Sequence, residues 1–103
     1  MEKNTPHYDL AVIKSEVRRL SQNAFTKTSV RSAEKLGFNV SEIQEIVFEL
    51  QTRMLYKSMT TYEDHRIWQD VYHINSRDQE IYIKVTYRPG GSPPVISFKE
   101  NNP

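Results

Sequence analysis

The sequence predicts an α+β domain in which N-terminal helices pack on one face of a C-terminal antiparallel β-sheet. Up to about residue 50 the apolar residues recur at helical spacing; after Arg53 the period changes to two, with aromatic and β-branched residues enriched. The links between the later segments are short, which favours an antiparallel meander. The 103 residues fit one compact domain spanning 1–103.

The first helix is expected to begin after Asp9, a suitable N-cap residue. Its apolar positions have helical spacing and are Leu10, Ile13, Val17 and Leu20. The polar segment 21–27 has neither the helical nor the strand period, so we interpret it as a connector.

Two further helices are expected before the sheet. Thr28 or Ser29 opens a short helix through about residue 36, and Gly37 follows where a left-handed C-cap is needed. Ser41 and Gln44 have the spacing of a capping box at the start of the next helix. The apolar stripe of that helix is Ile43, Ile46, Val47 and Leu50.

Four strands are expected, at about 55–62, 67–74, 80–87 and 94–99. The turn 75–78 joins the second to the third, and the Pro/Gly loop 88–94 joins the third to the fourth. Alternation directs one set of side chains toward the helices: Ile81, Ile83, Val85, Ile96 and Phe98. The opposite set faces away: Tyr82, Lys84, Thr86, Val95, Ser97 and Lys99.

The first two strands have an unusual composition, because hydroxyls, amides, aromatics and cations follow one another. In the first strand, alternation separates Lys57, Met59 and Thr61 from Tyr56, Ser58 and Thr60, so neither face is cleanly apolar. We therefore expect one side of the sheet to be a polar functional surface. The aromatic side chains expected to pack under the helices are Tyr56, Trp68 and Tyr72.

Composition excludes several classes of function. The chain has no Cys, which removes disulfides, thiolate nucleophiles and cysteine-based zinc sites. No apolar run is long enough to cross a bilayer or to act as a signal peptide, so a cytoplasmic location with no membrane role is expected. The net charge of +1 is weak for a nucleic-acid binder, so any phosphate site must come from local clustering of cations.

The run YKSMTTYEDHRIWQDVY at 56–72, with IYIKVT and ISFKE downstream and MEKNTPH at the start, resembles the MqsR family of toxin-antitoxin mRNA interferases. The resemblance implies a RelE-like fold and a toxin that cleaves mRNA as an endoribonuclease without needing the ribosome. It also implies a cognate, MqsA-like antitoxin as partner, often itself the DNA-binding component. Direct DNA binding is expected only for the toxin-antitoxin complex. The loop around 89–91 departs from the family text.

Cutting RNA without a metal requires a base for the ribose 2′-hydroxyl, positive charge near the phosphate and an acid for the leaving oxygen. Four residues on four different expected strands could meet these needs: Lys57, Gln69, Tyr82 and Lys99. The resemblance implies the same four. In our hypothesis the two lysines hold the phosphate and either could act as acid or base. Tyr82 positions the 2′-hydroxyl or stacks on a base, and Gln69 binds phosphate or a base edge.

A second group of residues is expected to contact RNA less directly: His7, Tyr62, His65, Arg66 and Lys84. His65 lies in the short link between the first two strands, where an imidazole could serve as acid or base near neutral pH. The three histidines lie far apart without helical pairing, so no metal and no cofactor are expected.

Two other interpretations compete with the nuclease. Ala33, Gly37 and Ile43 have the spacing of a helix-turn-helix, which would make the chain a DNA-binding regulator. The would-be recognition helix is acidic, however, and would repel phosphates; its acidic residues are Glu42, Glu45 and Glu49. In the third interpretation, the exposed edge of the sheet pairs with a strand of another protein.

Overall fold

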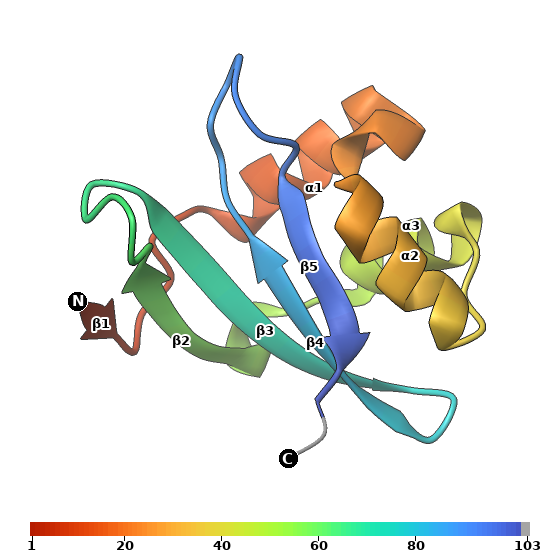
Figure 1. Ribbon diagram of the computed structural model, residues 1–103. Helices are drawn as coiled ribbons and strands as arrows, with labels where there is room; N and C mark the ends of the chain where they lie inside the picture. The colour runs from red at the N-terminus through yellow and green to blue at the C-terminus, as the bar shows by residue number, and fades with distance from the viewer. Residues whose placement is uncertain (102–103) are drawn as a thin grey trace.

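The computed structural model describes residues 1–101. Within them, three α-helices lie on one side of a five-stranded antiparallel sheet (Figure 1). The helices are α1 (Leu10–Leu20), α2 (Lys27–Lys35) and α3 (Val40–Glu49), and the strands are β1 (Glu2–Lys3), β2 (Leu55–Thr60), β3 (Trp68–Ser76), β4 (Gln79–Val85) and β5 (Val95–Glu100). The strands are ordered in space as in the sequence. The predicted α+β class, with N-terminal helices packed on one face of an antiparallel sheet, is confirmed, and only the short strand β1 precedes the helices.

The helix ends follow from local capping. Asp9 caps α1 by accepting a hydrogen bond from the Ala11 N–H, as predicted. A 3₁₀ turn, Ser21–Ala24, occupies most of the expected connector. The predicted start of the second helix at residue 28 or 29 is wrong, because the Thr26 side chain accepts from the Ser29 N–H and the helix begins at Lys27.

The capping box of α3 also differs from the prediction. It is formed by Asn39 and Glu42, whose side chains each accept a hydrogen bond from the other residue's backbone N–H, and not by Ser41 and Gln44. Gly37 has a φ of 91°, so the left-handed residue after the second helix was placed correctly.

The hydrophobic core lies between the helices and the sheet. Tyr72 from β3 is fully buried there. The other core side chains on the strands are Ile74, Ile81, Ile83, Val85, Val95 and Phe98. The helical ones are Leu10, Ile13, Val17, Ala33, Ile43, Ile46 and Val47. No helix within residues 1–101 is both long enough and apolar enough to cross a bilayer.

A β-bulge in β5 reverses part of the predicted alternation. Lys84 pairs with Ser97, but Val85 pairs with Val95, so Ile96 is an extra residue. Val95 is therefore buried in the core and Ile96 lines a cavity on the other face. The predictions that Ile96 faces the helices and Val95 faces away are both wrong for this reason.

A second irregularity changes β2. Leu55 pairs with Tyr72 and Lys57 with Val71, so Tyr56 is the extra residue. Tyr56 is 56% exposed, and its ring stacks on His73 instead of packing under the helices.

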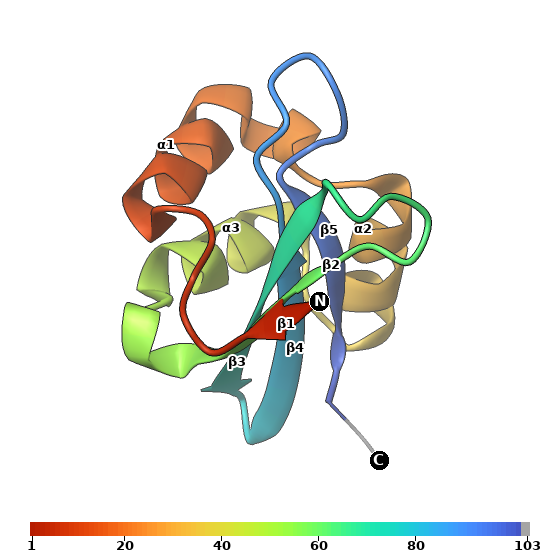
Figure 2. The same cartoon turned by 90° about the vertical axis from the view of Figure 1, so that its left-hand side faces the viewer.

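Trp68 does not pack under the helices either. Its ring stacks on His7 of the N-terminal segment at 4.9 Å between centroids. The same segment is held by Asp70, a fully buried carboxylate that accepts hydrogen bonds from the N–H groups of His7 and Tyr8. The two-residue strand β1, seen in front of β2 in Figure 2, was not predicted because it is too short to show a period.

Candidate functional site

The face of the sheet opposite the helices carries the candidate site. Cross-strand neighbours point to the same face of a sheet, so the pairing register defines which side chains meet there. One row runs across four strands and consists of Lys57, Val71, Lys84 and Ser97. The adjacent row consists of His73, Tyr82 and Lys99. We call the side with these rows the open face.

Tyr82 lies at the centre of a group of lysines. The Nζ atoms of Lys99 and Lys84 lie 5.0 and 5.9 Å from the centroid of its ring. Burial raises the pKa of the Tyr82 phenol, and the charge of Lys57 offsets part of that rise. The phenol therefore stays protonated at neutral pH and can donate a hydrogen bond.

Lys84 is the member of the group with the least favourable electrostatic surroundings. Its pKa is lowered first by burial and then by the positive charges of Lys99 and Lys57. Like charges gathered on a half-buried surface are unfavourable in the free protein, and an anion bound between them would relieve the repulsion. Lys57, Lys84, Lys99 and Tyr82 together are called the lysine cluster below.

The N-terminus supplies one anion to this cluster. The Glu2 carboxylate lies 2.8 Å from Lys57 Nζ, and this hydrogen bond raises the pKa of Lys57. The side chain of Glu2 is 63% exposed, so it is not fixed by packing. The contact shows that an oxyanion can reach Lys57 from the solvent side.

Two aromatic side chains of the site were missed in the sequence. Tyr56 stacks on His73 at 4.6 Å, and His73 lies 5.8 Å from Tyr82. Glu80 Oε1 is 3.5 Å from Nδ1 of His73. A signal for His73 was present, because it lies four residues after Gln69 on one strand and so shares its face. No such signal existed for Tyr56, whose orientation depends on the bulge.

Gln69, the fourth predicted catalytic residue, lies beside the lysine cluster. It pairs with Met59 and lines a cavity of about 650 Å³ on the open face. Lys84 lines the same cavity, so the two residues border one continuous surface. The structure thus brings Lys57, Tyr82, Lys99 and Lys84 together and places Gln69 next to them.

The other predicted RNA contacts lie outside the lysine cluster. His7 packs between Tyr8 and Trp68, and its pKa is lowered mainly by burial. Tyr62 and His65 lie in the loop between β2 and β3, with Tyr62 98% exposed at the rim of the cavity. Arg66 pairs with Asp64 at 3.0 Å, and its hydrogen bonds lower the pKa of that carboxyl to about 2.

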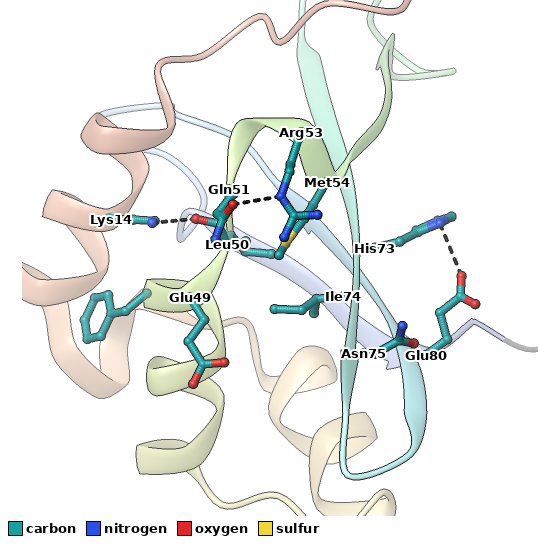
Figure 3. A pocket seen from close by; sticks show the side chains of 11 residues that line it. Lys14, Glu49, Leu50, Gln51, Arg53, Met54, His73, Ile74, Asn75 and Glu80 are labelled. Atoms are coloured by element: carbon teal, nitrogen blue, oxygen red, sulfur yellow. Dashed lines mark hydrogen bonds and ion pairs between the residues drawn. The ribbon is translucent and has the colours of Figure 1, made fainter.

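A different cavity, of about 850 Å³, opens between the end of α3 and the edge of β3 (Figure 3). Lys14 and Arg53 line it, but the first donates to the Leu50 carbonyl oxygen and the second to the Gln51 side chain. Glu49 is also in the lining. This mixture of charges makes it a poorer phosphate site than the lysine cluster. Within residues 1–101 no three His, Asp or Glu side chains gather as metal ligands.

The open face thus carries lysines around a protonated phenol, with stacked aromatic rings beside them. This is the arrangement expected of a small α+β protein that binds the phosphates and bases of a nucleic-acid strand. The family model described as the motility quorum-sensing regulator, toxin of MqsA, matches residues 5–100. The chain belongs to this family. It is 37% identical over 100 residues to the mRNA interferase toxin MqsR of Escherichia coli strain K12, covering 97% of this chain and 99% of that relative.

Proposed function

We propose that the lysine cluster is the site at which this protein cleaves single-stranded mRNA, without a metal, by attack of a ribose 2′-hydroxyl. The class of activity follows from the family: the chain is the toxin of a toxin-antitoxin pair and an mRNA interferase. A cognate antitoxin of the MqsA type is its protein partner. Since its substrate is mRNA, we place the protein in the cytoplasm, and we assign any DNA binding to the toxin-antitoxin complex.

The reaction requires only the RNA and two proton transfers. The 2′-oxygen forms a bond to the adjacent phosphorus while the bond from phosphorus to the 5′-oxygen breaks. The 2′-hydroxyl gives its proton to a base, and the departing 5′-oxygen takes one from an acid. The products are a 2′,3′-cyclic phosphate and a 5′-hydroxyl. Negative charge builds on the phosphate in the transition state, so ammonium groups fixed around it accelerate the step.

Each member of the site has a role in this scheme. Lys57 and Lys99 hold the phosphate oxygens, and either of them, in its neutral form, can take the proton of the 2′-hydroxyl; Lys84 adds charge between them. Tyr82, which burial keeps protonated, donates to a phosphoryl oxygen or to the leaving 5′-oxygen. Gln69 binds the phosphate or base edge on the side of the neighbouring cavity.

One observation carries the proposal: lysines from three strands lie around one phenol, although their positive charges repel one another. Lys57, Lys84 and Lys99 come from β2, β4 and β5, and the charges of the other two contribute to lowering the pKa of Lys84. Lysines on an ordinary exposed sheet face diverge into solvent and do not perturb one another in this way.

The test is cleavage of a short single-stranded RNA by the purified protein in excess EDTA. We expect fragments ending in 2′,3′-cyclic phosphate and 5′-hydroxyl, and a loss of roughly 10²-fold or more in kcat for Lys57→Ala, Tyr82→Phe and Lys99→Ala. Lys27→Ala is the matched control, because Lys27 is an exposed lysine on α2. Full activity in all three site variants, or cleavage only when a divalent metal is added, would refute the mechanism.

The helix-turn-helix interpretation is less well supported by the structure. Glu42 is committed to the capping box of α3 and also pairs with Arg77, and Glu45 lies beside it on the same surface. These carboxylates would face DNA phosphates if α3 entered a groove. Binding to duplex DNA tighter than to single-stranded RNA, in the absence of antitoxin, would favour this interpretation instead.

A further inference from the structure

The cavity beside the lysine cluster has the position expected of a binding site for part of the same RNA strand. It has a volume of about 650 Å³ and lies on the open face, bordered by the loops that follow β2 and β4. Gln69 and Lys84 belong to its lining. A strand whose phosphate sits among the lysines is therefore within reach of this cavity.

The lining combines apolar and hydrogen-bonding groups in the way that a flat heterocycle requires. Met59, Ile67 and Ile96 supply apolar surface. The hydrogen-bonding groups include the Gln69 amide and the hydroxyl of Ser97. Ile96 is part of the cavity because the β5 bulge turns it out of the core. Pockets of this kind bind apolar faces and orient polar edges.

Tyr62 stands at the rim with its side chain in water. It is 98% exposed, whereas Tyr72 is fully buried. A tyrosine ring gains nothing from packing in such a position, but a nucleobase entering the cavity could stack on it.

The charged groups of the lining are compatible with RNA. Lys84 and Arg88 offer positive charge to the phosphates on either side of a bound base. Asp64 is neutralised by Arg66 at 3.0 Å. Glu63 is exposed and also lines the cavity, where its carboxylate can accept hydrogen bonds from the amino group of a base.

We propose that this cavity receives one nucleobase adjacent to the cleaved phosphate, that Tyr62 stacks on that base, and that the cavity lining determines which base is accepted. The inference rests on the proposed function, because it places the base beside a phosphate held by the lysine cluster. It assigns selectivity to a cavity beside the cleaved phosphate, whose lining shares only Gln69 and Lys84 with the residues that assist bond breaking.

The first test pairs a protein change with an RNA change. The cleavage position is mapped on a random-sequence RNA pool, and substrates are then made with an abasic nucleotide at each position near the cut. Tyr62→Ala should raise KM by roughly 5- to 150-fold with little change in kcat. Tyr62→Phe keeps the ring and should therefore retain most of the affinity that Tyr62→Ala loses.

At one flanking position the abasic nucleotide should raise KM as well. At that position, the fold-increases in KM caused by the abasic nucleotide and by Tyr62→Ala should not multiply when the two changes are combined. Fold-increases that multiply fully at every position, or a Tyr62→Ala variant with unchanged KM on all substrates, would overturn the assignment of the base to this cavity. Absence of any RNA cleavage by the unmodified protein would instead refute the proposed function itself, so the two failures are distinguishable.

The second test changes the size of the cavity. Ile96→Trp reduces it and Ile96→Ala enlarges it, and folding of each is checked by circular dichroism. We expect the base preference at the mapped position to move in opposite directions, toward smaller bases in the first variant and larger ones in the second, with cyclic-phosphate ends retained. Identical sequence preferences in the folded variants would contradict the proposal.

Discussion

Replacing Asp70 with alanine tests how the N-terminal segment is attached to the sheet. Asp70 is fully buried, and its carboxylate accepts hydrogen bonds from the N–H groups of His7 and Tyr8 at 2.9 to 3.1 Å. Alanine leaves both donors without this acceptor. A hydrogen bond to a charged group contributes about 1.5–3 kcal/mol, so the two donors together set a range of roughly 3–6 kcal/mol.

The lower end of that range is expected for Asp70→Ala. The residues before Leu10 can leave the sheet and let water reach both N–H groups, which limits the loss to about 3 kcal/mol. For a domain of this size, each kcal/mol corresponds to about 4–8 °C, so Tm should fall by roughly 12–24 °C.

Thermal unfolding and urea titration followed by circular dichroism measure the loss. Asp70→Asn should be intermediate, because its amide oxygen can accept from one N–H while its NH₂ group opposes the other. Glu63→Ala removes an exposed carboxylate from the loop after β2 and should leave Tm nearly unchanged. A loss below about 1 kcal/mol in Asp70→Ala would refute the reasoning, since even one hydrogen bond to a charged group contributes more than that.

Three further outcomes are expected. Lys84→Met should raise Tm and lower RNA cleavage, because the lowered pKa of Lys84 means that folding disfavours its charge. In the unmodified protein, the loss of this charge should raise stability as the pH increases toward 10.5, and this rise should be missing in the variant. An unchanged Tm–pH profile in Lys84→Met would contradict this. Glu2→Gln should tighten binding of single-stranded RNA in fluorescence anisotropy, since it frees Lys57 from a competing carboxylate, and an unaltered Kd would argue against that competition. Tyr56→Ala should weaken the same binding by roughly 5- to 150-fold through lost stacking, with Tyr56→Phe as the control.

Sequence reasoning placed the elements well because their signals are local. The helical stripes and the caps at Asp9 and Gly37 depend on residues close in sequence. The strand β4 alternates without interruption, so Tyr82 and Lys84 were placed on the correct face. Strand limits differed from the predicted ranges by up to two residues, as is usual for strand ends.

The errors came from features that depend on distant partners. Nothing near Tyr56 or Ile96 marks a bulge, because each bulge is defined by the register with a neighbouring strand. A bulge reverses the face of every residue beyond it, so alternation alone cannot follow the strand across it. The position of Trp68 likewise depends on the N-terminal segment, which reaches it from far away in sequence.

The two bulges explain how strands that supply the core can also supply the site. Leu55 and Lys57 are two residues apart and would share a face in a regular strand, yet Leu55 packs against the core while Lys57 joins the open face. Val95 and Lys99 are four residues apart and are separated in the same way. In each strand one inserted residue lets the strand supply side chains both to the core and to the open face. The inserted residue itself lies on the open face: Tyr56 stacks on His73, and Ile96 lines the cavity. Since bulges are enriched near functional sites, their presence on both sides of β3 and β4 supports placing the chemistry on this face.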